Sequence, residues 1–260
     1  MIVQLMGGLG NQLFQWAFGV GLAHDLRRRV AFARGRDLGR SGYALDRYPL
    51  GVELAEFGAA TYREWGLPFN PEAYTAPDGS YLGYFQCEKY FVRAQATVRE
   101  KLTRPLRLSD MTLAIGRAID STPNSVLVHV RRGDNLSPRA LVFHGNLADT
   151  DYYDRAIEHV RSRVPNPTFF VFSDDPEWCG DNFRPDPCVV VAHNDPVSAC
   201  QEDLWLMSRC RHAIIANSSF SWWGAWLGPL CERVVVAPER WFVSKDADAR
   251  DIVPERWCRI

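Results

Sequence analysis

A run of apolar residues at 125–130 leads directly into a cluster of charged side chains. His129 lies at the end of this run, Arg131 and Arg132 follow it, and Asp134 comes two positions later. A guanidinium group can bind phosphate or carboxylate oxygens in pairs, so one arginine could hold a diphosphate while a carboxylate such as Asp134 anchors the other. A purely structural Arg–Asp pair explains the same residues equally well.

A second polar cluster, Ser173, Asp174 and Asp175, follows the apolar residues 169–172. Two adjacent carboxylates could chelate a metal, or one of them could accept two N–H bonds from a guanine edge. Asp175 precedes a proline and could instead cap the next helix. We expect capping to be the role of one of the two carboxylates.

A third cluster, Asn217, Ser218 and Ser219, follows the apolar run 212–216 and precedes a helix-like segment that begins near Phe220. The unpaired amides and the dipole at a helix N-terminus favour a bound anion, and hydroxyl groups there add further donors. The polar residues could equally serve only as a helix cap. The tryptophans of the segment are expected in the core: Trp222, Trp223 and Trp226.

A glycine-rich turn at residues 7–10 follows a short apolar run and opens a helical pattern. Its spacing is not that of the dinucleotide fingerprint GxGxxG, and no P-loop is present in the sequence. We interpret the turn as a flexible element that brings Gly8 and Asn11 towards a ligand in a cleft between domains. Ordinary turn geometry is the competing account.

The elements that must position these clusters are clearest in the second half of the chain. Continuous β-branched runs alternate there with helical patterns, which predicts a parallel sheet covered on both faces. Ligands of such sheets collect at the carboxyl ends of the strands, where all three clusters fall. The expected strands are 125–130, 168–172, 188–192, 212–216 and 233–237, and the expected helices are 110–120, 151–163, 196–209 and one from about 221.

The first half of the chain is less regular. Residues 2–6 predict a strand followed by a helix, and residues 88–102 predict another helix. Residues 30–80 are rich in Gly, Pro and aromatic residues, so we expect irregular connections there. A proline at 105 interrupts the pattern, which places the expected domains at 1–108 and 109–260.

Composition excludes several classes of protein. The chain has 260 residues, of which 47% are hydrophobic, so it can bury a sizeable core. Lys and Arg number 30 against 31 for Asp and Glu. This balance provides no overall positive field for a nucleic-acid backbone, so we expect no nucleic-acid partner and a purely local anion site.

The seven cysteines form no CxxC pair. Their scatter argues against a zinc site and against a disulfide framework, and it fits buried thiols in a reducing compartment. The N-terminus lacks the pattern of a signal peptide, and no apolar stretch reaches about 18 residues. We therefore expect a cytoplasmic protein without a membrane span, and the sequence leaves peripheral association with the inner membrane and the oligomeric state open.

Five segments together resemble the bacterial alpha-1,2-fucosyltransferases of glycosyltransferase family 11. They are GGLGNQLFQWA at the N-terminus, GYFQCEKYF at 83–91, HVRRGD, FVFSDDPEW and the long block EDLWLMSRCRHAIIANSSFSWWGAWL. The resemblance implies an α/β, GT-B-like fold with two Rossmann-like halves: an N-terminal acceptor-side domain at 1–108, and a C-terminal GDP-fucose-binding domain at 109–260 with the donor site on its parallel sheet. It also implies GDP-fucose as donor, inversion at the anomeric carbon, and a galactose-containing glycan as acceptor that receives an alpha-1,2 linkage.

The resemblance further implies that no cofactor or metal is required, and the adjacent Asp174 and Asp175 differ from the DxD spacing of metal-dependent glycosyltransferases. Arg131 is the expected contact to the diphosphate, and Asp134 or His144 could be the catalytic base. The complete set expected to bind the donor is Gly8, Asn11, His129, Arg131, Arg132, Ser173, Asp174, Asp175, Asn217, Ser218, Ser219 and Phe220.

The sequence departs from the family pattern at Phe85 and Cys87, where Trp and Ser are common, and at Asn135, where an aromatic residue is common. We expect Phe85 and Cys87 to line the acceptor side, so the acceptor is the least transferable part of the resemblance. Two alternatives remain. One is a fucosyltransferase that forms another linkage or uses another acceptor, and the other is a catalytically inactive GDP-sugar-binding module.

Overall fold

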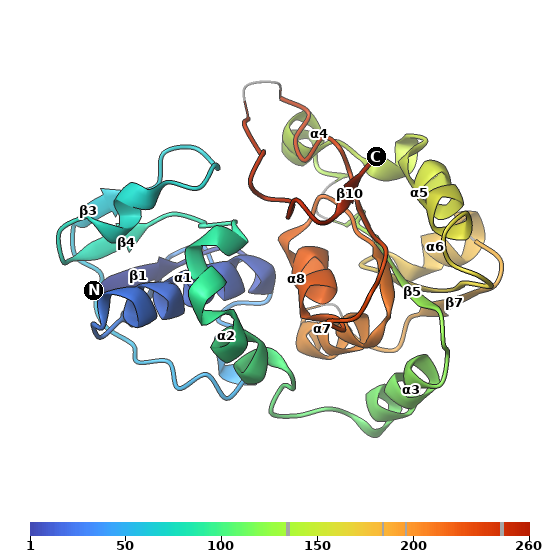
Figure 1. The fold of residues 1–260 in the computed structure, drawn as a ribbon, viewed down its shortest axis with the longest axis horizontal. Coiled ribbons are helices and arrows are strands. Elements are labelled where there is room, and N and C mark those ends of the chain that lie inside the picture. Colours follow the sequence, from blue (N-terminus) through green and yellow to red (C-terminus); the bar gives the residue numbers. More distant parts are fainter. Residues whose placement is uncertain (134–135, 184, 196, 245–246) are drawn as a thin grey trace. The chain divides into compact units, whose positions relative to one another are not determined.

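The computed structural model describes residues 1–133, 136–183, 185–195, 197–244 and 247–260, and the chain forms two compact units (Figure 1). The first unit contains residues 1–107 together with Ala247–Pro254, and the second contains 108–246 and 255–260. The sequence predicts domains at 1–108 and 109–260, so the structure differs mainly in the C-terminal segment. This segment packs on the first unit before the chain returns to the second.

The first unit is built on a four-stranded parallel sheet with strand order β2-β1-β4-β3. A strand followed by a long helix is confirmed at its N-terminus, whereas β2 and β3 lie in the region 30–80, where we expected irregular connections, and β4 begins at its last residue. The predicted helix at 88–102 is a 3-10 segment with non-helical backbone at Phe91, followed by an α-helix. The elements are β1 Ile2–Leu5, α1 Leu9–Leu26, β2 Ala31–Arg34, β3 Ala60–Arg63, β4 Ser80–Leu82, the 3-10 helix Glu88–Ala94 and α2 Gln95–Leu102, with short 3-10 turns at Leu45–Arg47 and Pro71–Tyr74.

Aromatic side chains form the core of the first unit. Phe18 of α1 stacks on Phe85 with 3.8 Å between ring centroids, and the Tyr90 ring lies 5.2 Å from Phe18. Phe85 and Cys87 are fully buried. The expectation that these two side chains line the acceptor side is therefore wrong, because both residues point into the core. The residue between Gly83 and Phe85, Tyr84, is exposed instead.

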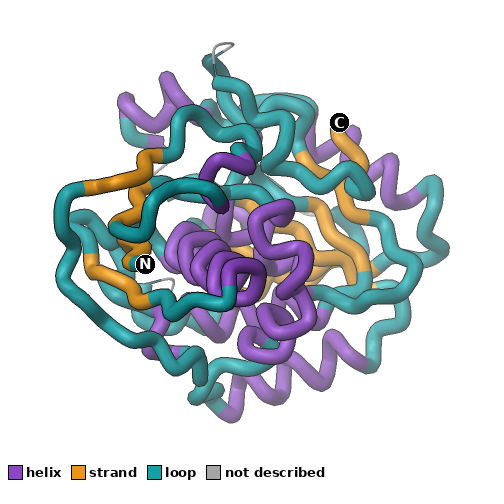
Figure 2. The backbone as a smooth tube through the Cα atoms, turned by 60° about the vertical axis from the view of Figure 1, so that its left-hand side comes forward, coloured by secondary structure: helices purple, strands orange, loops and turns teal. Residues whose placement is uncertain are grey.

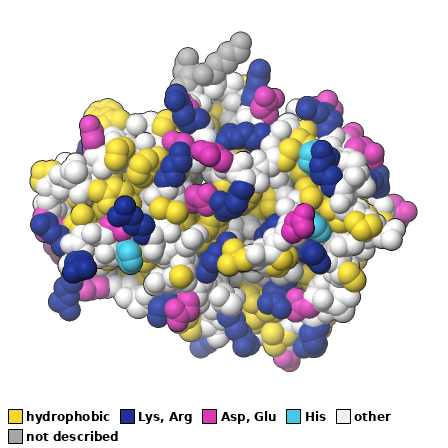
Figure 3. All heavy atoms as spheres, viewed as in Figure 1, with side chains coloured by type: hydrophobic (Ala, Val, Ile, Leu, Met, Phe, Trp, Pro, Cys, Tyr) yellow, Lys and Arg dark blue, Asp and Glu magenta, His cyan; other side chains and the backbone are white. Residues whose placement is uncertain are grey.

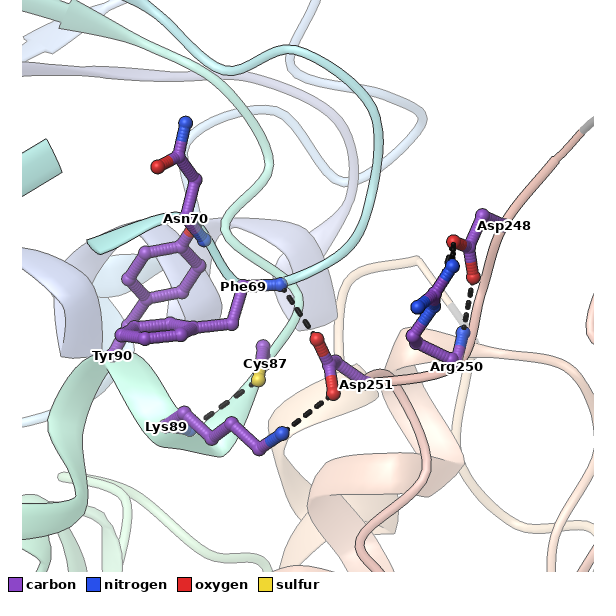
Figure 4. Close-up of polar contacts among 8 residues, drawn as sticks. All are labelled: Phe69, Asn70, Cys87, Lys89, Tyr90, Asp248, Arg250 and Asp251. Carbon is purple, nitrogen blue, oxygen red and sulfur yellow. Dashed lines mark hydrogen bonds and ion pairs between the residues drawn. The ribbon is translucent and has the colours of Figure 1, made fainter. Parts of the chain in front are cut away.

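The segment Ala247–Pro254 is held on the first unit by Asp251 (Figure 4). Its carboxylate accepts hydrogen bonds from the Phe69 amide at 2.9 Å and from Lys89 Nζ at 2.6 Å. Burial tends to raise the pKa of Asp251, but the bonds from Lys89 and Phe69 outweigh burial and hold this pKa below its ordinary value. Asp248 and Arg250 form a second, exposed pair in the same segment.

The second unit contains a six-stranded parallel sheet with strand order β10-β9-β8-β5-β6-β7. All five predicted strands and all four predicted helices are present, and an α/β fold with two parallel sheets is confirmed. The elements are α3 Asp110–Asp120, β5 Ser125–Val130, α4 Pro138–His144, α5 Tyr152–Arg161, β6 Thr168–Ser173, α6 Pro176–Asn182, β7 Cys188–Val191, α7 Cys200–Arg209, β8 His212–Ile214, α8 Ser219–Leu227, β9 Val235–Ala237 and β10 Cys258–Arg259, with a 3-10 turn at Leu147–Asp149.

Helices cover both faces of this sheet, which explains why its strands are continuously apolar (Figure 2). Val126, Val128 and Val130 of β5 pack in one core cluster with residues of α5. Residues on the opposite face of β5 lie beneath α8, where the Leu127 side chain approaches Gly224. The three tryptophans of α8 are buried as predicted: Trp222, Trp223 and Trp226.

The visible face of the molecule carries basic and acidic side chains interspersed with one another (Figure 3). This pattern agrees with the nearly balanced charge of the sequence. Among the helices that the structure describes, none is long and apolar enough to cross a membrane.

Candidate active site

Three neighbouring strands of the second sheet deliver the predicted clusters to one edge. β5 pairs with β6 on one side, where Val130 lies opposite Ser173, and with β8 on the other, where Val128 lies opposite Ile214. All three strands run in the same direction, so the residues that follow them meet at the carboxyl edge of the sheet. The structure thus brings together the clusters that begin at Arg131, Asp174 and Asn217.

Arg131 and Ser218 connect the ends of β5 and β8. A guanidinium nitrogen of Arg131 donates to Ser218 Oγ at 3.1 Å, and the same oxygen accepts from the Phe220 amide at 3.3 Å. Ser218 is therefore the N-cap of α8 and also a ligand of the arginine. Ser219 is the first residue of the helix. A cation beside a helix N-terminus is an arrangement that can bind a diphosphate.

Arg132 is held in place by the acidic pair after β6. Its amide donates to Asp174 Oδ1 at 2.8 Å, its Nε donates to Asp175 Oδ2 at 3.0 Å, and its guanidinium lies 3.8 Å from the centroid of the Trp178 ring. The Arg132 side chain is only 13% exposed. One arginine is anchored on a carboxylate as predicted, and among the described residues that carboxylate is Asp175. Asp134 lies outside the described residues.

The acidic pair also organises its own turn. Asp175 Oδ1 accepts from the Trp178 amide at 3.2 Å and caps α6, which confirms the predicted capping role. Ser173 Oγ accepts from the Asp175 amide at 3.0 Å. Asp174 uses Oδ1 for Arg132, and its other oxygen takes no hydrogen bond from the described part of the chain.

His129, the next-to-last residue of β5, is buried at this edge of the sheet. It is 6% exposed, and its ring centroid lies 5.9 Å from that of Phe220. Burial lowers the pKa of His129 to about 4, against an opposing effect of Asp174 and with a smaller contribution from Arg131. The imidazole is therefore neutral at pH 7, and Arg131 is a positive charge that acts on it. His129 Nδ1 has no hydrogen-bond partner among the residues described.

Two tyrosines that the sequence did not indicate hold the strand ends from beneath. The Tyr153 hydroxyl donates to the His129 carbonyl at 2.8 Å, and the Tyr152 hydroxyl lies 2.5 Å from the Ile215 carbonyl. Both side chains project from the first turn of α5 and are buried. They fix the backbone two residues before Arg131 and two residues before Asn217. In sequence the pair looks like ordinary apolar residues of an amphipathic helix.

Asn217 connects the third cluster to the segment after HVRRGD. Its side-chain amide donates to the His144 carbonyl at 2.8 Å and to the Trp241 carbonyl at 3.1 Å. His144 ends α4, with its ring centroid 5.3 Å from that of Phe242. The predicted candidate base therefore belongs to the surroundings of Asn217.

The predicted residues Gly8 and Asn11 belong to the first unit. Gly8 is the N-cap of α1, and Asn11 Oδ1 accepts from Gln86 Nε2 at 2.7 Å. Gln12 and Gln15, both fully buried, hold the surrounding loops by bonds to backbone groups at Gly7, Gly42, Ala44, Met6 and Gly83. Much of the N-terminal motif therefore serves to shape the glycine turn, and the ligand contact of Gly8 and Asn11 remains a prediction.

The edge of the second sheet thus has the chemistry of an anion pocket. It presents one arginine near a helix N-terminus, a second arginine fixed by two aspartates, and a neutral histidine. Within the described ranges, no three His, Cys, Asp or Glu side chains lie together in a way that could hold a metal ion.

The family model described as Glycosyl transferase family 11 matches residues 52–260. The chain belongs to glycosyl transferase family 11. This confirms the resemblance found in the sequence, and the match includes every cluster of the second sheet. Across its full length the chain is 33% identical to an alpha-1,2-colitosyltransferase of Escherichia coli, with 98% of that protein covered.

Other relatives match over shorter stretches. An O-antigen biosynthesis glycosyltransferase of Escherichia coli, WbnK, is 38% identical over half of this chain and 43% of its own length. A galactoside alpha-(1,2)-fucosyltransferase 1 of Bos taurus is 32% identical over 52% of this chain and 38% of its own length.

Among solved structures, the alpha-1,6-fucosyltransferase NodZ soaked with GDP-fucose superposes with a TM-score of 0.53 at 14% identity. The superposition covers 88% of this chain and 92% of that protein. The likeness confirms the predicted GT-B-like fold.

Proposed function

We propose that this protein transfers L-fucose from GDP-fucose to the 2-hydroxyl of a β-galactoside and forms an alpha-1,2 linkage with inversion. The observation that carries the proposal is the Arg131–Ser218 contact at the N-terminus of α8, in a chain of glycosyl transferase family 11. The contact supplies a fixed cation where a leaving diphosphate would develop charge. The names of the bovine and bacterial relatives support the linkage.

In the transfer, the acceptor hydroxyl oxygen forms a bond to the anomeric carbon while the bond from that carbon to the β-phosphate oxygen breaks. The electron pair of the broken bond stays on GDP, and the hydroxyl proton passes to a base. Arg131 stabilises the diphosphate, and the amides of α8 assist it. Asp134 and His144 are our candidates for the base, and His144 belongs to the segment that Asn217 fixes.

Guanine recognition falls to the turn after β6 in this proposal. Asp174 keeps one carboxylate oxygen without a described protein partner, while its other oxygen is fixed by the Arg132 amide. A carboxylate held in this way can accept N–H groups from a guanine edge. Arg132 acts as a positioning residue, since its guanidinium is already bound to Asp175 and packed on Trp178.

A direct assay tests the proposed activity. The protein is incubated with GDP-fucose, EDTA and an array of β-galactosides, and products are detected by mass spectrometry and assigned by NMR. We expect an alpha-1,2-fucosylated galactoside, formed without added metal. No product with any acceptor, or a linkage to another hydroxyl, would contradict the proposal. Activity that EDTA abolishes and Mg²⁺ or Mn²⁺ restores would contradict metal independence.

A colitosyl group is the second candidate for the transferred sugar, because the E. coli colitosyltransferase matches the full chain. The two donors can be compared directly by measuring kcat/KM for GDP-fucose and GDP-colitose with the same galactoside. We expect the higher value with GDP-fucose. A preference for GDP-colitose would replace the donor while leaving the diphosphate pocket and the linkage unchanged.

We also propose that the protein works in a reducing compartment, the cytoplasm. All seven cysteines are free thiols, and four of them are buried: Cys87, Cys179, Cys200 and Cys210. The transfer assay is run with and without dithiothreitol, and we expect equal activity in both. Loss of activity on reduction would contradict this location.

A further inference from the structure

A cluster of aromatic rings flanks the Arg131 edge of the second unit. Phe143, near the end of α4, lies with its ring centroid 4.6 Å from that of Phe242 and 4.9 Å from that of His144. Phe242 is 8% exposed, whereas Phe143 is 44% exposed. One ring of the cluster is therefore buried as a support, and another presents much of its surface to solvent.

Hydrogen bonds fix this cluster beside the proposed diphosphate pocket. The Asn217 amide binds the carbonyls of His144 and Trp241, which are adjacent in sequence to Phe143 and Phe242. Asn217 in turn precedes Ser218, the ligand of Arg131. The Val243 amide also donates to the Phe143 carbonyl at 2.9 Å. A single buried side chain thus sets the position of the rings relative to the pocket.

The exposed surface around Phe143 is apolar. Leu141 is 37% exposed, Val142 is 77% exposed and Val243 is 53% exposed. Clustered exposed apolar side chains on a soluble domain commonly mark a binding surface. A fixed aromatic ring next to a polar pocket suits a hexose, because a pyranose ring carries C–H groups on one face and hydroxyl groups at its edges.

We propose that Phe143, supported by Phe242, is the wall on which the acceptor packs the apolar face of its galactosyl ring. The inference rests on the proposed transfer to a β-galactoside and adds the residues that recognise this acceptor. The Asn217 hydrogen bonds favour a sugar over a lipid bilayer, since they fix the backbone next to Phe143 and Phe242 in one position beside the proposed diphosphate pocket. A bilayer requires apolar exposure but no fixed ring orientation.

Steady-state kinetics with Phe143→Ala, Phe143→Tyr and Leu230→Ala test this assignment. Leu230 is 82% exposed in the same unit and serves as the matched surface control. Phe143→Ala should raise the acceptor KM roughly tenfold, on the scale of one lost aromatic contact. The KM for GDP-fucose and the slow hydrolysis of GDP-fucose without acceptor should stay unchanged, and Phe143→Tyr should restore the acceptor KM. Leu230→Ala should behave as wild type.

An unchanged acceptor KM in folded Phe143→Ala would overturn the assignment. Binding to vesicles containing anionic lipid is measured in parallel by flotation. If Phe143→Ala, but not the control variant, loses vesicle binding while its acceptor KM is unchanged, the surface is a membrane contact instead. If wild type makes no product, the proposed function fails. In that case, saturation-transfer NMR with methyl β-galactoside and GDP tests this inference separately from the proposed function. The signal at the galactose ring protons should be weaker with Phe143→Ala than with wild type, and an equal signal contradicts the inference.

Discussion

Arg131 and Ser218 lie 87 positions apart in the sequence, yet the guanidinium of one is 3.1 Å from the hydroxyl oxygen of the other. The contact joins the ends of β5 and β8, two neighbouring strands of one parallel sheet. It explains why the charged cluster after β5 and the serine-rich cluster after β8 occur together in this chain. In the proposed function, each contributes one part of a single anion pocket.

Ser218→Ala should lower both stability and turnover. The variant loses the cap of α8, at a cost of about 1 kcal/mol, and frees the Arg131 guanidinium from this ligand. We expect kcat to fall by roughly tenfold, less than for loss of the arginine itself. Ser109→Ala is the matched control, because Ser109 caps α3 in the same unit. It should show a similar stability loss in urea unfolding with normal kcat, and an equal fall in kcat would refute a local role of Ser218.

Tyr153→Phe should destabilise the protein and impair catalysis. The substitution leaves the buried His129 carbonyl without its hydroxyl donor, which costs about 1–3 kcal/mol. Tyr62→Phe provides the comparison, because the Tyr62 hydroxyl is buried with no hydrogen-bond partner in the described ranges. It should be neutral or slightly stabilising. Equal unfolding midpoints for the two variants would show that the Tyr153 bond contributes nothing.

Glu64 should make stability depend on pH. Burial raises the pKa of Glu64 to about 7, against opposing hydrogen bonds from the Phe85 and Tyr84 amides. The folded chain therefore binds one more proton than the unfolded chain between about pH 4.5 and 7, so this group's contribution falls as pH rises. The unfolding free energy of Glu64→Gln, measured relative to that of wild type, should therefore rise by about 1.4 kcal/mol per pH unit across this window. Above the window the difference should stay constant.

The comparison with wild type is needed because other buried groups titrate with the opposite sign. Burial lowers the pKa of His129 and that of His212 to about 4, so the unfolded chain binds more protons below pH 6.5 and stability falls on acidification. These contributions cancel in the difference. Glu158→Gln, at a carboxylate that is 72% exposed, is the control and should follow wild type. A pH-independent difference for Glu64→Gln would contradict the prediction.

Asp251→Ala should weaken the attachment of the C-terminal segment to the first unit. It removes the acceptor of the Phe69 amide and of Lys89 Nζ, and we expect a loss of about 1–3 kcal/mol in unfolding free energy. Asp248→Ala lies three residues away and breaks only an exposed pair with Arg250 (Figure 4). Limited proteolysis should cut the segment faster in Asp251→Ala than in Asp248→Ala. Equal rates would show that Asp251 does not hold it.

The two units differ in how well the sequence predicts them. β5 and β6 are long apolar runs bounded by polar residues, so their positions follow from hydrophobicity alone. β2, β3 and β4 have only three or four residues each and lie among glycines and prolines. Such short segments contain too few residues to show the hydrophobic periodicity of a strand. The C-terminal segment depends on Asp251, whose partner Lys89 lies 162 positions away.

The sequence predicted the polar clusters of the candidate site, but not the contacts that their residues make with one another. Strand ends indicated Arg131, Asp174 and Ser218, because parallel strands share one carboxyl edge. The carboxylate that anchors Arg132 lies 43 positions away at Asp175, and no local spacing in the sequence indicates that contact. Tyr153 gave no signal at all, since a hydroxyl that binds a strand carbonyl looks in sequence like a core aromatic residue.

The kinetics of Arg131→Ala test the central claim most directly. GDP release from GDP-fucose in the presence of a saturating β-galactoside is measured for this variant and for Arg155→Ala, a surface arginine of α5 that is 55% exposed. We predict that kcat falls by roughly 10²-fold or more in Arg131→Ala and stays normal in Arg155→Ala, with both proteins folded by thermal unfolding. Near-normal turnover in folded Arg131→Ala would contradict a diphosphate pocket built on the Arg131–Ser218 contact.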